Sequence, residues 1–195
     1  MIAIVVIASN QLCGINAILF YAKQLFNKIT NNENLLTQTL MVILAIIQII
    51  ATVISSFIVD RKGRRPMLLS GYVILVVLLV GIFLSDTFLS SSFHNFSEVL
   101  IIVLLFLHIF VMNMTLGAIC IVYCAEIVED ITWVIITLKI GSLSMALGTD
   151  YMIQFLGIGK MFLLFGALTF LIFLFLRGKI IETKGLEPNQ IYPLF

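Results

Sequence analysis

The stretch Asp60-Arg61-Lys62-Gly63-Arg64-Arg65 decides how this chain is organised, because it holds four of the eleven Lys and Arg residues in six positions. Segments without a charged residue lie on either side of it, at 35–59 and 66–85. Each is long enough to cross a bilayer as a helix, which takes about 20 apolar residues. A basic loop between two such spans stays in the cytoplasm. The chain is therefore predicted to be a polytopic membrane protein of defined orientation.

The composition of the whole chain indicates a lipid environment. Of its 195 residues, 62% are hydrophobic and 11% are charged, whereas soluble domains carry about 25% charged residues. The formal net charge is +1, and the basic residues gather in short loops and do not form a surface stripe. The lipid bilayer is therefore an expected partner, and nucleic acid is not.

The apolar segments predict an all-α membrane protein with six transmembrane helices. They form a bundle over residues 1–176, which is followed by a polar tail at 177–195. The weakest break between two spans is Thr149–Gly157, which contains Asp150. The expected spans are Ile2–Phe26, Leu35–Val59, Met67–Asp86, Val99–Ala125, Ile131–Gly148 and Ile158–Leu176.

The distribution of basic residues predicts the orientation of the bundle. An even number of spans places both termini on one side of the membrane. The loop at 60–65 and the tail hold seven basic residues, and the opposite side holds three at most. Because Lys and Arg are retained on the cytoplasmic side, both termini are predicted to be cytoplasmic. We expect a multi-pass protein of the plasma membrane rather than of an organelle.

The first span contains three carboxamide side chains, Asn10, Gln11 and Asn16. Such groups are costly in hydrocarbon, so they should face protein, water or a ligand. On a continuous helix Asn16 would lie about 140° around the axis from Gln11, with Gly14 between them allowing another helix to approach closely. Their donors and acceptors suit a neutral polyhydroxyl ligand. From spacing alone, hydrogen bonding between helices is the preferred explanation, and contact with a ligand is the alternative.

Other polar residues inside the spans are Gln48, His108, Asn113 and Lys139. Gln48 suits either helix packing or ligand contact. His108 has no evident carboxylate partner, so we expect a hydrogen-bonded packing role and not a proton relay. Lys139 is expected to extend to the membrane surface, to pair with an acid, or to show that the fifth span is bounded differently.

Four short motifs together resemble the sugar porter family of the major facilitator superfamily. The segment Asn10–Ala17, followed by Phe20-Tyr21, resembles the QQxxGIN…YY signature of helix seven in that family. The stretch at 60–65 resembles its D/E-R-x-G-R-R loop, and Ala125-Glu126-Ile127 resembles the acidic end of helix ten. Ile181-Glu182-Thr183-Lys184-Gly185 is similar to its P-E-T-K-G motif. The four motifs occur in the order of the C-terminal half of the family.

The resemblance implies transport of hexoses or related polyols, small neutral molecules, by alternating access. It assigns sugar contacts to five carboxamides and the closure of the cytoplasmic face to a cluster of charged residues and a glycine. The implied sugar-binding residues are Asn10, Gln11, Asn16, Gln48 and Asn113. The implied members of the cluster are Asp60, Arg61, Gly63, Arg64, Arg65, Glu126 and Glu182. Facilitated diffusion is favoured over proton coupling, because no acid lies near Gln11 or Asn16 in the sequence.

The chain also departs from the pattern of the family. The family's tenth helix reads G-P-x-P-W, whereas this chain has Gly117-Ala118-Ile119-Cys120-Ile121. None of the three prolines falls inside an expected span, which leaves Gly117 as the local weak point in place of a proline hinge. Ser144-Met145 replaces an Asn-Trp pair, and Ile181 replaces the proline of the last motif. These differences keep open a degenerate, non-transporting scaffold or sensor derived from the same family.

One half of a transporter would expose the polar side of its first and fourth spans to lipid, which is unfavourable. We therefore expect an N-terminal six-helix half or a partner subunit to complete it, and the position of Met1 inside the first span favours a fragment of a longer protein. An unrelated membrane enzyme or channel is the third alternative. The chain contains no H-E-x-x-H or G-x-S-x-G motif. No enzyme activity, catalytic residue, metal site or cofactor is predicted.

Overall fold

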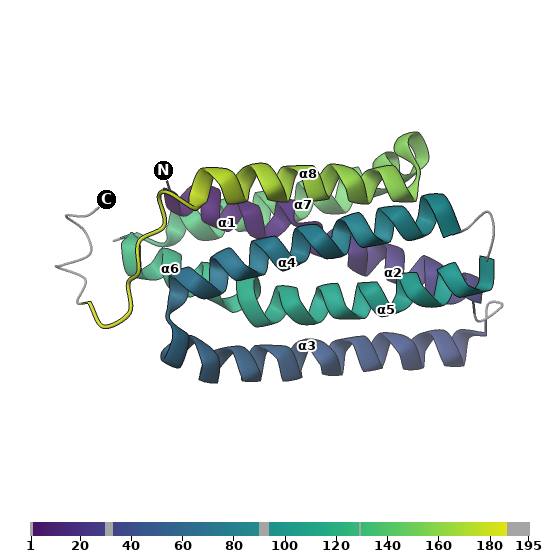
Figure 1. Ribbon diagram of the computed structural model, residues 1–195, viewed down its shortest axis with the longest axis horizontal. Coiled ribbons are helices and arrows are strands. Elements are labelled where there is room, and N and C mark those ends of the chain that lie inside the picture. Colours follow the sequence, from purple (N-terminus) through teal and green to yellow (C-terminus); the bar gives the residue numbers. More distant parts are fainter. Residues whose placement is uncertain (1, 30–32, 90–93, 129, 187–195) are drawn as a thin grey trace.

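The computed structural model describes residues 2–29, 33–89, 94–128 and 130–186. Within them the chain is all α, and its helices run side by side along the long axis of the molecule (Figure 1). Two segments, η1 and η2, are π-helical. The elements are α1 (Ile2–Leu12), α2 (Ile15–Ile29), α3 (Asn34–Lys62), α4 (Arg64–Leu84), η1 (Ser85–Leu89), α5 (His94–Met112), η2 (Asn113–Gly117), α6 (Ala118–Ile127), α7 (Thr132–Leu156) and α8 (Ile158–Leu176).

Six stretches of the described residues are long and apolar enough to cross a membrane, which confirms the expected number of spans. The chain breaks within the expected segment Thr149–Gly157, but only at its last residue, because α7 continues to Leu156 and Gly157 takes a φ of 74°. The stretch at 60–65 was expected to be a loop, but α3 extends to Lys62 and α4 begins at Arg64, so only Gly63 lies between the two helices. Pro66 was expected outside the spans but lies in the first turn of α4, where the absence of its N–H breaks no helical hydrogen bond.

The first span is two helices and not one. Gly14 separates α1 from α2. Its φ is 81°, a value that residues other than glycine rarely adopt. A Cβ atom on Gly14 would lie 3.1 Å from the ring of Phe165 on α8, so this residue also allows the expected close approach of another helix. The prediction of a continuous first helix is therefore wrong at this residue.

The fourth span passes from α5 to α6 through η2, which ends at Gly117. A π-helical turn carries one extra residue per turn and occurs often at functional sites. The neighbouring helix α4 accommodates the wider turn at Gly71, where an added Cβ atom would collide with Thr115. The local weak point expected at Gly117 is thus a π-helical segment.

Packing divides the six spans into two groups. In the spans formed by α3 and α7, 17% and 11% of the residues are buried, against 39% or more in the other four spans. Figure 1 shows α3 at one edge of the bundle, with α4 and α5 between it and α8. The core lies among α1, α2, α4, α5, α6 and α8. The sides of α3 and α7 therefore remain uncovered in this chain.

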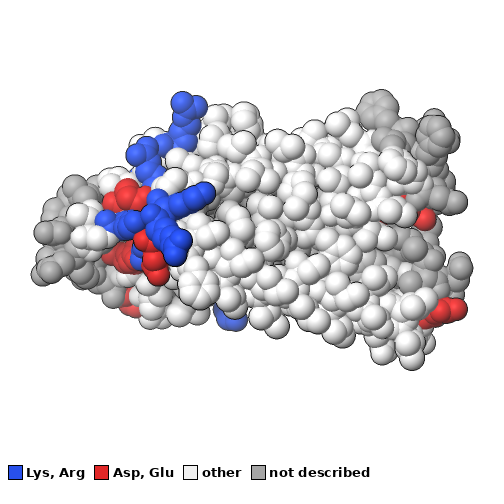
Figure 2. All heavy atoms as spheres, turned by 60° about the horizontal axis from the view of Figure 1, so that its bottom comes forward, with Lys and Arg blue, Asp and Glu red and all other residues white. Residues whose placement is uncertain are grey.

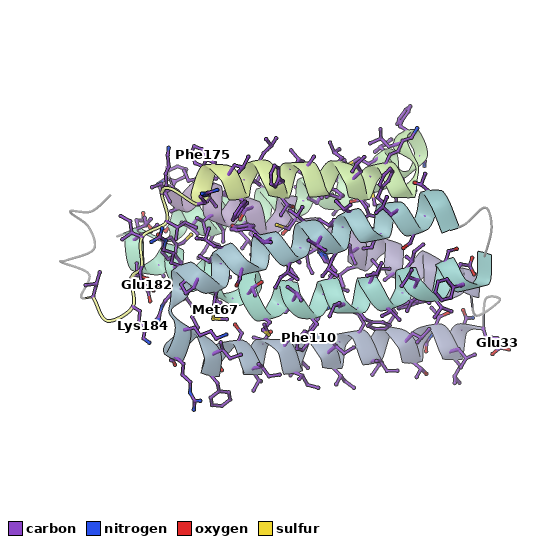
Figure 3. All side chains as sticks on the ribbon, viewed as in Figure 1. Glu33, Met67, Phe110, Phe175, Glu182 and Lys184 are labelled. Atoms are coloured by element: carbon purple, nitrogen blue, oxygen red, sulfur yellow. The ribbon has the colours of Figure 1, made fainter. Side chains whose placement is uncertain are left out.

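The start of α1 and the described part of the tail lie at one end of the bundle, together with the α3–α4 connection. The Sγ atom of Cys124, near the end of α6, donates to the carbonyl of Ala3 at 3.3 Å. The Nζ atom of Lys184 donates to the carbonyl of Arg61 at 2.7 Å. In Figure 3, Glu182 and Lys184 lie at this end and Glu33 lies at the other.

Candidate functional site

Asn10 connects α1 to the π-helical turn of the fourth span. It is 8% exposed, and its Nδ2 atom donates to the carbonyls of Leu116 and Gly117 at 3.3 and 3.5 Å. A π-helical turn shifts carbonyls away from the regular i to i+4 pattern, so they can accept a bond from outside the helix. Asn10 therefore forms hydrogen bonds between helices, one of the two explanations that its position in the sequence allowed. Both acceptors lie in the π-helical turn.

Gln11 and Asn16 bond to each other across the break in the first span. The Nδ2 atom of Asn16 donates to Oε1 of Gln11 at 2.6 Å. The positive φ of Gly14 brings them together, whereas a continuous helix would have held them about 140° apart. Gln11 also packs on α7, where a Cβ atom on Gly141 would lie 2.9 Å from Gln11 Cγ. Gly141 was not singled out in the sequence, because nothing in it indicated a contact with Gln11.

Gln48 and Asn113 line one open groove of about 310 Å³ between α3 and η2, together with Ile49, Thr52 and Val53. The Nδ2 atom of Asn113 donates to the Ile109 carbonyl at 2.9 Å, within its own helix. The carboxamide of Gln48 makes no hydrogen bond with the described residues, so its donors and acceptor are available to a ligand. Sequence reasoning missed Thr52, although its position four residues after Gln48 indicates the same helix face.

The five predicted sugar-binding residues thus form two groups, and the adjacent residues Asn10 and Gln11 join them along the chain. One group is Gln11 with Asn16. The other surrounds η2 and contains Asn10, Gln48 and Asn113. No hydrogen bond joins the groups within the described residues. All five side chains are uncharged, so they can donate to and accept from hydroxyl groups without requiring a charged ligand.

Two further polar residues, His108 and Lys139, lie inside the spans. His108 is buried, and neither of its ring nitrogens makes a hydrogen bond in the described part of the chain. Its packing position is as expected, whereas the described residues show no hydrogen bond of regular geometry to its ring. Lys139 is exposed on α7, within the fifth span, and makes no ion pair with a described residue.

Arg64 is the centre of the charged cluster at the end of the bundle. Its Nε and Nη2 atoms donate to Oε1 of Glu126 at 3.1 and 2.9 Å. Its Nη1 atom lies 3.8 Å from Oδ1 of Asp60, one turn earlier. The side chains of Arg64 and Glu126 are 17% and 25% exposed, so this pair is less screened by water than a surface pair.

Glu182 holds the tail on the first turn of α4. Its two carboxylate oxygens accept from the backbone N–H groups of Arg64 and Arg65 at 2.8 and 3.1 Å. The first N–H groups of a helix lack partners within the helix, and a negative charge there is favourable. Gly63 makes room for this contact, because its φ is 91° and a Cβ atom would lie 2.6 Å from Oε2 of Glu182.

Three residues of the 181–185 motif for which the sequence predicted no role, Ile181, Thr183 and Lys184, also bind the tail to the bundle. The Oγ1 atom of Thr183 donates to Oε2 of Glu126 at 2.6 Å. Lys184 donates to the Arg61 carbonyl, and the OH of Tyr123 accepts from the backbone N–H of Ile181 at 3.2 Å. The polar side chains of Thr183 and Lys184 within the 181–185 motif were the sequence feature that could have indicated these contacts.

Two predicted members of the cluster contribute only backbone atoms. The guanidinium groups of Arg61 and Arg65 make no ion pair with any described carboxylate, whereas their backbone C=O and N–H groups bond to the tail. Figure 2 shows Lys, Arg, Asp and Glu side chains gathered at this end, while the long middle of the same face is nearly free of them. Asp60, Arg64, Glu126 and Glu182 therefore form the part of the cluster that interacts through side chains, and Gly63 leaves room for it.

Comparison with known proteins matches residues 1–195 to the family model described as "Sugar (and other) transporter". The chain is 29% identical over 199 residues to the glucose facilitated diffusion protein of Zymomonas mobilis, covering 95% of the chain and 40% of that protein. It is 26% identical over 201 residues to the sugar transporter ERD6-like 7 of Arabidopsis thaliana, covering 98% of the chain and 42% of the relative. The chain thus spans about two fifths of the length of these relatives.

The fold also matches a solved structure of the proton:xylose symporter XylE, a major facilitator superfamily protein, bound to 6-bromo-6-deoxy-D-glucose. The TM-score is 0.77 at 18% identity, and the match covers 97% of this chain and 41% of the other. At this identity the likeness shows the fold. Since residues 1–195 match the family model and the described residues contain six apolar spans, the chain belongs to the family described as "Sugar (and other) transporter", has the fold of a major facilitator superfamily protein and is an integral multi-pass membrane protein.

Proposed function

We propose that the chain forms the C-terminal half of a sugar transporter that works by alternating access. The observation that carries this proposal is the pair of interrupted spans, α1–α2 and α5–η2–α6, whose uncharged carboxamides lie at or beside the interruptions. In transporters, substrate sites lie between the two halves and are built on broken helices. Relatives of this chain are described as glucose and sugar transporters.

The proposed substrate is a small neutral sugar or polyol. The groove beside Gln48 and Asn113 offers a carboxamide with no protein partner and a second one with an unused oxygen. The Gln11–Asn16 pair retains further donors, since their mutual bond uses one donor and one acceptor. Binding therefore requires hydroxyl groups on the ligand and no counter-charge. Facilitated diffusion is the simplest mode of transport for such a site.

The charged cluster is proposed to hold the cytoplasmic face closed in one of two states. Arg64 and Glu182 join the α3–α4 connection to the end of α6 and to the tail. Breaking and remaking such bonds allows parts of a transporter to change position as rigid bodies. The excess of Lys and Arg at this end favours a cytoplasmic location for the cluster and for both termini. The plasma membrane is the proposed location.

A second set of six helices is proposed to cover α3 and α7. These two spans are the least buried, and the groove beside Gln48 opens next to α3. An N-terminal half on the same polypeptide, or a partner subunit, would enclose the polar side chains between two halves. The substrate path is then formed only when both halves are present.

The test is sugar uptake by the natural full-length protein that contains this chain, produced in cells that lack hexose uptake. We expect saturable uptake of D-glucose or another hexose, and none of L-glucose. Gln11→Ala and Asn16→Ala should each weaken sugar affinity about fivefold, the value of one neutral hydrogen bond, with normal insertion into the membrane. Gln38→Ala, an exposed carboxamide on α3 far from Gln48, is the matched control.

Two results would contradict the proposal. A protein that reaches the membrane but neither transports nor binds sugar would favour the non-transporting scaffold. Unchanged affinity in both Gln11→Ala and Asn16→Ala would show that the site lies elsewhere, even if uptake itself is observed.

A further inference from the structure

A second groove opens between α4 and α8, at the end of the bundle that carries the charged cluster. Its volume is about 370 Å³. Its lining residues are Arg65, Leu69, Ser70, Val73, Phe173 and Arg177. Three of those on α4 follow one another at intervals of four, and Phe173 on α8 lies four positions before Arg177, the residue that follows this helix. Residues at this spacing share one face of a helix, so each helix contributes a stripe with an arginine at its outer end.

The two arginines of this groove have no carboxylate partner among the described residues. Arg65 and Arg177 are exposed, and neither guanidinium lies within 4 Å of a described Asp or Glu side chain. The neighbouring Arg64 differs, because Glu126 and Asp60 neutralise it. The carboxylate of Glu182 bonds to the backbone of Arg65 and not to its side chain. The groove therefore has two uncompensated positive charges at its mouth.

The rest of the groove is apolar. Leu69, Val73 and Phe173 form its wall, and Val73 remains 47% exposed. The hydroxyl of Ser70 donates to the Met67 carbonyl of its own helix at 3.1 Å. A cationic mouth above an apolar wall within a membrane span complements a molecule with an anionic head and a hydrocarbon chain. Free phosphate would leave the wall uncovered.

We propose that this groove binds an anionic phospholipid of the cytoplasmic leaflet. The phosphate lies between Arg65 and Arg177, whose planar guanidinium groups donate several hydrogen bonds to phosphate oxygens. One acyl chain lies along Leu69, Val73 and Phe173. Basic pockets between spans on the cytoplasmic side are suited to such head groups, and this leaflet is rich in anionic lipid. The bound lipid would hold α4 and α8 together beside the charged cluster.

The test measures lipid binding to the purified natural protein in detergent by native mass spectrometry. Phosphatidylglycerol is compared with phosphatidylcholine of the same acyl chains, and we expect the anionic lipid to bind more tightly. A basic residue near the head group contributes about a fivefold change in affinity, so Arg65→Gln/Arg177→Gln should bind phosphatidylglycerol about 25-fold more weakly. The double variant Arg61→Gln/Lys62→Gln removes the same charge from the same end of the molecule and should bind normally.

Two further measurements distinguish a lipid site from a site for phosphate or for charge in general. Val73→Trp fills the apolar wall without changing charge and should weaken phosphatidylglycerol binding, while glycerol 3-phosphate should not compete. If the double variant does not fold, the single variant Arg177→Gln, at an exposed helix end, tests the contribution of one arginine. Its affinity for phosphatidylglycerol should fall about fivefold. Equal losses in the groove and control double variants, or competition by glycerol 3-phosphate, would overturn the proposal.

Discussion

The charged cluster and the mid-bundle carboxamides satisfy their polar groups in different ways. In the cluster, Arg64 and Glu182 bond to groups more than a hundred positions away or on another helix. Among the carboxamides, Asn16 bonds to Gln11 five positions away, and Asn113 bonds within its own helix. The carboxamide of Gln48 has no partner in the described residues.

This difference indicates where the chain is held together and where it is open to a ligand. Charge-assisted bonds are about twice as strong as neutral ones, and those of the cluster join three segments of the chain. The carboxamides use only part of their hydrogen-bonding capacity on the protein. We therefore expect substitutions in the charged cluster to reduce stability. Substitutions around the groove beside Gln48 and Asn113 should reduce sugar affinity at little cost in stability.

The largest effect on stability is expected for Arg64→Ala. It leaves Glu126, whose side chain is 25% exposed, without its cationic partner. Breaking a buried pair costs about 3–5 kcal/mol, and partial exposure puts this pair at about 3 kcal/mol, measured by SDS titration with circular dichroism. The control is Arg61→Ala, whose guanidinium has no ion pair with a described residue and which should cost below about 0.5 kcal/mol. Equal costs in the two variants would show that net charge matters and the pairing does not.

A smaller loss is expected for Gly63→Ala. A side chain at this φ of 91° is strained, and its Cβ atom would displace the carboxylate of Glu182. Strain of this kind costs about 1–3 kcal/mol, so we expect about 2 kcal/mol in the same titration. Gly178→Ala is the matched control, because a Cβ atom there meets nothing within 4 Å. If Gly63→Ala left the free energy of unfolding unchanged, the contact between Glu182 and the start of α4 would be refuted.

The next effect concerns the bond across the helix break. Gln11→Ala and Asn16→Ala each remove the same hydrogen bond, so their effects on stability should not add. A double-mutant cycle should give a coupling free energy of about 1 kcal/mol. Gln11 and Gln48, which share no bond, form the control cycle, and their effects should add within about 0.5 kcal/mol. Additive effects for Gln11 and Asn16 would contradict the break at Gly14 as described.

The smallest effect on stability is expected for Gln48→Leu. This change removes a carboxamide that has no described protein partner, so stability should change by less than about 0.5 kcal/mol. In the natural full-length protein the KM for sugar should nevertheless rise about fivefold, because one hydrogen bond to the ligand is lost. Gln38→Leu on the same helix should alter neither quantity. A large loss of stability in Gln48→Leu would place this residue with the cluster and not with the groove.

Much of the fold could be predicted from the pattern of apolar residues. The six spans and the basic connection between the second and third of them follow from length and charge, since the membrane requires about 20 apolar residues for each crossing. The breaks could not be predicted in the same way. Gly14 and Gly157 take positive φ, but Gly148 continues a helix. A glycine permits a turn without requiring one.

The site was predictable in residue type and less so in arrangement. Carboxamides inside spans indicate a polar function, because hydrocarbon excludes them unless they have partners. Their grouping depended on two local irregularities. The sequence did not indicate the break at Gly14, and of the π-helical turn at 113–117 it indicated only a weak point at Gly117. Similarly, the motif at 181–185 identified Glu182 but not its contact with the backbone of Arg64 and Arg65.

The sequence by itself determined that this protein lies in a membrane, how many times it crosses and which family it resembles, because hydropathy and short motifs are local properties of the chain. Only the tertiary structure decided which polar groups share a partner, which arginines pair with a described carboxylate and which spans stay uncovered. These properties depend on contacts between residues far apart in the chain. A change of backbone angle at one glycine alters them without altering the composition of any span.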